Sequence, residues 1–155
     1  MAYSIRFWGT RGSIPAPGPN TIRYGGNTPC TTVEGSDGNL VILDAGSGNR
    51  ELGLSLSGPG STPLKADILI SHTHWDHIQG LPFFRPLNVG GNAVRIYGAR
   101  QQEASLREVL DRQMDPVVFP IPLAALPADL SIQEIGEEAF EIDGFEVRTR
   151  RLRHP

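Results

Sequence analysis

A short apolar run that leads directly into a cluster of histidines constrains this chain more than any other feature. Residues 65–70 (KADILI) predict a strand that is buried on both faces of a sheet. Ser71 follows, and residues 72–77 (HTHWDH) contain three histidines and one aspartate. Open α/β sheets bind ligands at the carboxyl ends of their strands, because loops there are held by a rigid scaffold and still face solvent. The sequence therefore predicts a binding site directly after this strand.

The spacing of these side chains predicts a metal site. His72 and His74 are two positions apart, so in extended backbone both imidazoles point the same way. Asp76 and His77 follow where the chain turns towards a helix, and we expect them to face a second, adjacent ion. A lone histidine is more often a hydrogen-bonded core or surface residue, but three of the four histidines of this chain lie in the motif. Neutral imidazole and carboxylate are ligands of zinc and similar divalent ions.

The motif His72-x-His74-x-Asp76-His77 resembles the signature of the metallo-β-lactamase-fold hydrolases. Residues 41–48 (VILDAGSG) are similar to the strand-then-glycine segment of that superfamily. Residues 7–13 (FWGTRGS) and 24–28 (YGGNT) are similar to the branch that includes ribonuclease Z and related phosphodiesterases. The resemblance implies an α/β fold of the αββα sandwich type, with residues 1–155 as a single domain.

The resemblance also implies a ligand set for two metal ions. His72, His74 and a third histidine bind one metal, and His154 matches the third. Asp76 and His77 bind the second metal, and Asp76 is the residue we expect to be catalytic. Two zinc ions are expected in the complete site, with manganese or iron as alternatives.

Asp44 ends a predicted strand and is expected to support this site. By accepting a hydrogen bond from a metal-binding histidine, it would orient the imidazole of that histidine. Alternatively it caps the following helix through its side-chain oxygen, and both roles can hold together. The second metal of the resembling family also needs a bridging aspartate and a further histidine from the second half of the fold. No histidine remains for this and no aspartate follows Asp143, so we expect the C-terminal part of the fold to be missing from this chain.

Ion chemistry points to a hydrolase. A divalent metal lowers the pKa of bound water from near 16 to about 7, and two cations neutralise charge on phosphoryl oxygens. A metal-bound hydroxide acting on a phosphodiester is therefore the expected function, with a lactone or thioester as alternative substrate. The other class of function is a catalytically inactive metal-binding fragment or an interaction subunit.

Charge and composition limit the binding partners and the cellular location that we expect for this chain. A formal net charge of −3 does not indicate bulk binding of nucleic acid, so a nucleic-acid partner would need a local patch. Four arginines lie just before His154 and are either a solvated edge or a weak funnel for an anionic substrate: Arg148, Arg150, Arg151 and Arg153. One cysteine, no leader and no membrane-length apolar run make a soluble cytoplasmic protein the expectation.

Two further expectations concern the surface of the protein. Residues 9–29 are rich in glycine and proline, which predicts a long loop that is either functional or mobile. Half of a sandwich leaves one apolar face bare, so the chain is expected either to belong to a longer protein or to pair with another chain, as in a homo-oligomer. The residues expected to be partly uncovered are Ile5, Phe7, Val41, Leu43, Ile68 and Ile70.

Overall fold

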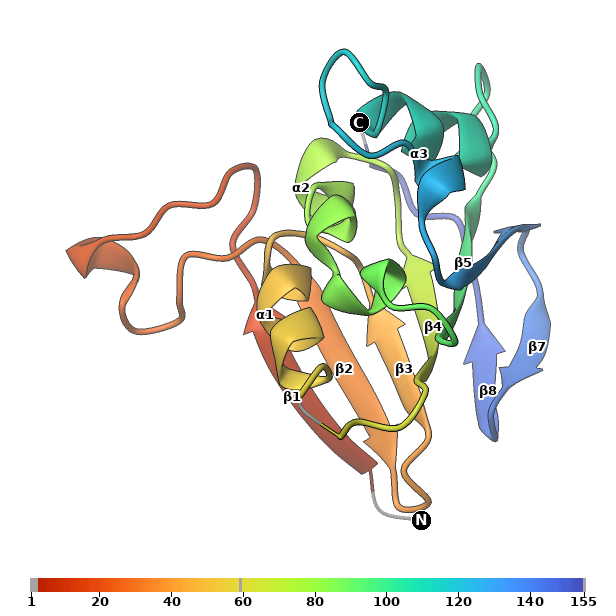
Figure 1. Cartoon of the computed structure of the whole chain (residues 1–155), viewed down its shortest axis with the longest axis horizontal. Coiled ribbons are helices and arrows are strands. Elements are labelled where there is room, and N and C mark those ends of the chain that lie inside the picture. The colour runs from red at the N-terminus through yellow and green to blue at the C-terminus, as the bar shows by residue number, and fades with distance from the viewer. Residues whose placement is uncertain (1–2, 59, 155) are drawn as a thin grey trace.

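The computed structural model describes residues 3–58 and 60–154 and has a six-stranded sheet at its centre (Figure 1). The strands, which are adjacent in sequence order, are β1 (Tyr3–Gly9), β2 (Cys30–Gly35), β3 (Leu40–Leu43), β4 (Lys65–Ile70), β5 (Ala93–Ala99) and β6 (Asp129–Ile135). β1, β2 and β3 pair antiparallel, whereas β3 to β6 pair parallel. The parallel half therefore brings the carboxyl ends of β3 and β4 to the same edge of the sheet.

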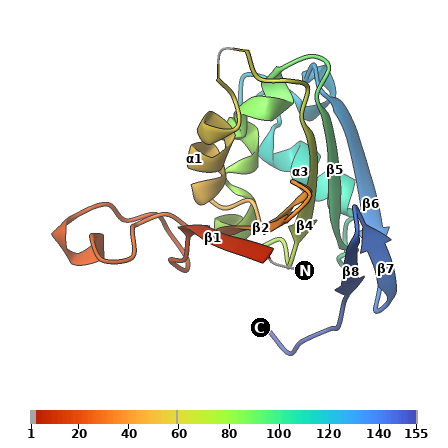
Figure 2. The same cartoon turned by 90° about the horizontal axis from the view of Figure 1, so that it is seen from below.

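Helices cover one face of this sheet, and a separate two-stranded hairpin lies against the other face (Figure 2). The helices are α1 (Gly48–Ser55), α2 (Trp75–Ile78) and α3 (Leu106–Gln113), with the 3-10 turns η1 (Pro19–Thr21), η2 (Leu81–Phe83), η3 (Arg85–Asn88) and η4 (Leu123–Ala125). The hairpin consists of β7 (Ala139–Ile142) and β8 (Phe145–Arg148). None of the described helices is both long and apolar enough to span a bilayer.

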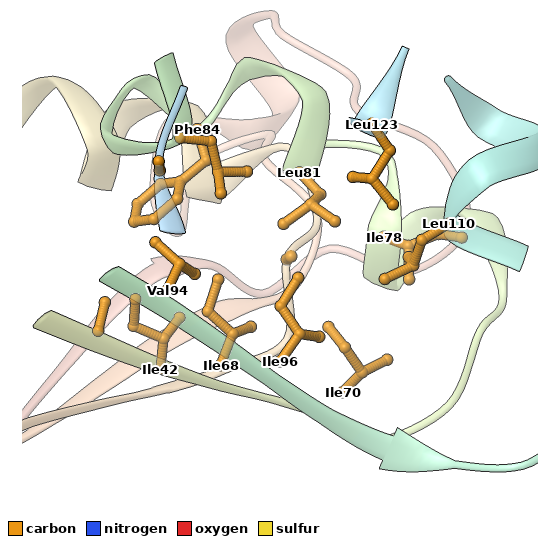
Figure 3. Close-up of a cluster of buried hydrophobic side chains, with 14 of the residues drawn as sticks. Ile42, Ile68, Ile70, Ile78, Leu81, Phe84, Val94, Ile96, Leu110 and Leu123 are labelled. Carbon is orange, nitrogen blue, oxygen red and sulfur yellow. The ribbon is translucent and has the colours of Figure 1, made fainter. Parts of the chain in front are cut away.

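The main core lies between the sheet and the helices (Figure 3). Ile42, Ile68 and Ile96 stand directly opposite one another on β3, β4 and β5, and all three are fully buried. Leu81 and Phe84 pack over them from the segment that follows α2. Burying a side chain of this size contributes about 1.5–3 kcal/mol, so this layer stabilises the fold and gives the loops above it a rigid base.

The hairpin covers part of the opposite face. Val41, Tyr97 and Ile142 form a second buried cluster there. Arg95 joins the two sheets, since its guanidinium contacts Asp67 at 2.6 Å and Asp143 at 3.2 Å. Asp143 begins the hairpin turn with a positive φ of 45°, and Gly144 follows at 81°. These angles suit the tight turn that an Asp-Gly pair predicts.

The remainder of that face is uncovered. Ile5, Phe7 and Leu43 are 61%, 68% and 41% exposed, as expected for a sheet that lacks a partner layer. The same expectation is wrong for Val41, Ile68 and Ile70, which are buried. Ile68 and Ile70 belong to the helix-covered core, and Val41 packs in the cluster beneath the hairpin.

Candidate metal centre

The histidine motif lies at the end of β4, in the place that the sequence predicts. His74 has extended backbone angles (φ −59°, ψ 147°), and α2 starts at the next residue. His72 and His74 therefore precede the helix, whereas Asp76 and His77 belong to its first turn. This change of backbone direction separates the two pairs of side chains.

Three imidazoles converge on one point. The ring centroids of His72 and His154 are 4.6 Å apart, and those of His74 and His154 are 4.9 Å apart. Each of the three rings offers a nitrogen, and these nitrogens all lie within 4.8 Å of one another. His154 thus reaches the motif across 82 residues of sequence, as the resemblance implied.

The donor set fits a zinc ion. Two nitrogens bound to a tetrahedral zinc at about 2.0–2.1 Å lie roughly 3.3–3.4 Å from each other. Nε2 of His72 and Nε2 of His154 are already 3.1 Å apart. Burial, together with the neighbouring imidazoles of His77, His74 and His154, lowers the pKa of His72 below its ordinary value. A lowered pKa keeps this imidazole neutral, which is the form that binds metal.

Asp44 contacts the second pair of side chains. Its Oδ2 lies 2.8 Å from Nδ1 of His77, and its two oxygens accept hydrogen bonds from the backbone N–H and the hydroxyl of Ser71 at 2.8 and 3.0 Å. With Nδ1 engaged, Nε2 of His77 is the nitrogen left for an ion. The alternative that Asp44 caps α1 is wrong, because Ser47 occupies the N-cap position and the Asp44 carboxylate is directed at Ser71 and His77.

Close backbone packing fixes α2 relative to the loop after β3. The backbone N–H of Ala45 donates to the carbonyl of His77 at 2.8 Å, and the N–H of Gly80 donates to the carbonyl of Ala45 at 2.8 Å. A Cβ atom on Gly80 would lie only 1.9 Å from the carbonyl oxygen of Gly46, so no other residue fits at this contact. The loops after β3 and β4 are thus locked together, which sets the distance between Asp44 and His77.

Asp76 is held by an unexpected donor. The backbone N–H of Ser13 donates to Oδ2 of Asp76 at 2.7 Å, and Nε2 of His77 lies 3.6 Å from the same oxygen. Burial raises the pKa of the Asp76 carboxyl, but the Ser13 N–H and the charge of His77 outweigh it and leave the pKa below its usual value. The carboxylate is therefore ionised at neutral pH, as a ligand must be.

A strap after β8, residues 149–154, delivers His154. The hydroxyl of Thr149 donates to the carbonyl of Gly136, and the backbone N–H of Arg151 donates to the carboxylate of Glu137 at 2.8 Å. Arg151, Arg153 and His154 line one open pocket. Arg148 is paired with Glu146 instead, which agrees with the solvated edge expected for that arginine.

Two residues that form hydrogen bonds with the candidate site, Ser71 and Ser13, were not predicted from the sequence. Ser71 lies within 3.1 Å of Nδ1 of His72 as well as touching Asp44, and its place directly before the motif was the available signal. Ser13 reaches Asp76 across 63 residues through its backbone, which leaves no trace in residue type.

A family profile described as a beta-lactamase superfamily domain matches residues 39–155. The chain belongs to this family. The superfamily expected from the histidine motif is thereby confirmed. Ribonuclease Z of Lactobacillus gasseri is 31% identical over 97% of this chain, and ribonuclease Z of Natronomonas pharaonis is 24% identical over 99% of it. The chain spans 45% of the length of each of these relatives.

Solved structures show the same fold of the superfamily. A diphosphatase of the PhnP family matches 93% of this chain with a TM-score of 0.62 at 23% identity. Unliganded yeast PDE1 matches 92% of it with a TM-score of 0.55 at 15% identity. The matched region is 54% and 53% of those two chains. The chain thus carries about half of a metallo-β-lactamase-like α/β fold, in agreement with the expectation that part of the sandwich is missing.

Proposed function

We propose that this chain carries the metal-binding part of a metal-dependent hydrolase that cleaves phosphodiesters. The observation that supports the proposal most directly is the convergence of His72, His74 and His154. Asp76 and His77 lie beside them, and we propose them as ligands for a second ion. Two zinc ions are proposed for the complete site, with manganese or iron as alternatives.

Each residue has a defined task in this proposal. When bound, the ions lower the pKa of a water molecule and stabilise charge on the phosphoryl oxygens. His72, His74 and His154 hold one ion through neutral imidazoles, and Asp76 with His77 holds the other. Asp44 keeps the proton of His77 on Nδ1, so that Nε2 is available.

The choice of a phosphodiester rests on two observations. The relatives are named ribonuclease Z, and the structural neighbours are named a diphosphatase and PDE1. In addition, Arg151 and Arg153 line the same open pocket as His154, where they would favour an anionic substrate.

Hydrolysis of an activated aryl phosphodiester tests the proposal. The zinc-loaded chain, and any longer gene product that contains it, is compared with the variants His74→Ala and Asp76→Ala. Both substitutions are expected to abolish turnover, while Arg50→Ala on the outer side of α1 serves as the unaffected control. Unchanged rates in folded His74→Ala and Asp76→Ala proteins would rule out the mechanism. Faster hydrolysis of a lactone or thioester would overturn the substrate class only.

A second function is favoured by the length of the chain relative to its relatives. Because the chain spans 45% of two ribonuclease Z proteins, it is also a candidate for a metal-binding piece without turnover of its own, or for an interaction subunit. The number of metal ions bound per chain distinguishes the hydrolase from the metal-binding piece. Two tightly bound ions per chain favour the enzyme, and one or none favours the binding piece.

A further inference from the structure

An arm formed by residues 10–26 projects from the body of the protein (Figures 1 and 2). At its base, the backbone N–H groups of Thr10 and Arg11 both donate to the carbonyl of Asn27 at 3.0 Å. Beyond this base, the described residues show one hydrogen bond from the arm to the rest of the chain, from the Ser13 N–H to Asp76 Oδ2. We call this hydrogen bond between Ser13 and Asp76 the tether. It links the arm to a carboxylate of the proposed metal site.

The other hydrogen bonds of the arm close it on itself. The backbone N–H of Ala16 donates to the carbonyl of Gly26 at 2.9 Å, and the hydroxyl of Thr21 donates to the carbonyl of Ala16 at 2.8 Å. Nε of Arg11 donates to the carbonyl of Ile14 at 2.9 Å, and this bond spans Ser13 in the sequence. These hydrogen bonds connect parts of the arm to one another and do not involve Asp76.

Ser13 is the central residue of a γ-turn, in which the backbone N–H of Ile14 donates to the carbonyl of Gly12 at 3.0 Å. Its φ is +71°, in a region that residues other than glycine rarely adopt. Such a conformation persists where surrounding contacts enforce it, and here the γ-turn and the bond to Asp76 both involve Ser13 or its neighbours. A hydrogen bond from an N–H to a carboxylate is among the stronger ones, and its length of 2.7 Å agrees with a charge-assisted bond.

We propose that the backbone N–H of Ser13 is a positioning group for Asp76, and that Asp76 in turn holds the arm against the metal centre. The same oxygen lies 3.6 Å from Nε2 of His77, so the bond orients the carboxylate beside the nitrogen proposed for the second ion. The proposal rests on the proposed function only in taking Asp76 as a metal ligand. Because coupling between two events is reciprocal, ion binding at Asp76 and docking of the arm then influence each other to the same extent.

Amide hydrogen exchange of the metal-free chain tests the tether without any activity measurement. The Ser13 amide is expected to be protected in the unmodified chain and to exchange about tenfold faster in Asp76→Ala, which corresponds to about 1.4 kcal/mol. Asp76→Asn is the matched control, because its amide oxygen still accepts the bond, and protection should be retained. Equal exchange in the unmodified chain and in Asp76→Ala would overturn the tether.

Substitutions at Ser13 test the positioning of Asp76. Ser13→Gly keeps the N–H and suits the positive φ, and Ser13→Ala keeps the N–H without the hydroxyl, so both should retain the zinc affinity of the unmodified chain. Ser13→Pro removes the donor and cannot adopt this φ. Its affinity for the second zinc ion, measured after the first site is filled, is expected to fall by about tenfold, the usual scale for a lost partner of a metal ligand. Trypsin cleavage after Arg23 should accelerate only in Ser13→Pro and Asp76→Ala.

The outcomes separate this proposal from the proposed function. Equal affinity for the second zinc ion in Ser13→Pro and Ser13→Gly would overturn the positioning role even if the protein hydrolyses phosphodiesters. Loss of protection in Asp76→Ala, together with weaker zinc binding by Ser13→Pro, would support it even if no phosphodiester is cleaved. Loss of zinc affinity in Ser13→Ala would assign the effect to the hydroxyl and overturn the role of the backbone.

Discussion

Oδ2 of Asp44 lies 2.8 Å from Nδ1 of His77, although 33 residues separate the two in sequence. Asp44 holds a positive φ of 62°, so removing its carboxylate by an alanine would also disturb the backbone. Asp44→Gly removes the carboxylate and suits that φ. We expect its zinc affinity to drop by about 10–100-fold, as for other lost partners of a ligating histidine. Titration against a competing chelator measures this.

Asp44→Asn is the matched control for that experiment. Asparagine tolerates the same backbone conformation and keeps an oxygen that accepts from Nδ1 of His77, so most of the zinc affinity should remain. Equal losses in Asp44→Asn and Asp44→Gly would contradict the role assigned to hydrogen bonding and would point to the charge of Asp44.

His154 is predicted to be required for tight binding of the first ion. His154→Ala removes one of three converging nitrogens, so cobalt binding should weaken and the absorption spectrum of the bound cobalt should change with the loss of a nitrogen ligand. Leu152→Ala, an exposed neighbour in the same strap, is the control and should leave the spectrum unchanged. An unaltered spectrum in His154→Ala would show that the strap does not deliver a ligand.

The metal-free chain is predicted to lose stability as the pH falls through 6.5, the ordinary pKa of histidine. Burial and the neighbouring imidazoles lower the pKa of His72 in the folded state, so the unfolded chain binds more protons in this range. The free energy of unfolding should therefore rise with pH until His72 is neutral in both states. Denaturant unfolding at a series of pH values measures the slope, which should be shallower in His72→Gln. An equal slope in both proteins would exclude His72 as the source.

The uncovered face of the sheet is predicted to make the isolated chain associate. Ile5 and Phe7 are 61% and 68% exposed on the face that lacks a partner layer. The chain should bind a hydrophobic dye and form oligomers in light scattering, and Ile5→Thr with Phe7→Thr should reduce both effects while keeping strand-forming residue types. Val117→Thr, at an exposed apolar position outside this face, is the control. A compact monomer without dye binding would show that this face needs no cover.

Local sequence patterns determined the elements that carry the site. The apolar run at residues 65–70 predicts a strand, and β4 has those same bounds. The Asp-Gly pair at 143–144 predicts the turn between β7 and β8, which the structure has. These patterns succeed because hydrophobic periodicity and turn preference act between residues that are close in the chain.

One helix starts later than its apolar spacing predicts, for a local reason. The apolar stripe of Leu106, Val109 and Leu110 predicts a helix over residues 102–113, whereas α3 begins at Leu106. Ser105 and Glu108 form a capping box that ends the preceding loop. The signal for this boundary is present in the sequence, but apolar spacing alone does not reveal it.

Only the tertiary structure decided which long-range partners complete the site and which faces are covered. Parallel pairing of β3 with β4 brings Asp44 to His77, the strap brings His154 to His72, and the fold of the arm brings Ser13 to Asp76. Val41 is buried by a hairpin formed a hundred residues later, whereas Ile5 on the same face is not. Such contacts depend on the register of strands and the course of loops, and neither is encoded in the spacing of nearby residues.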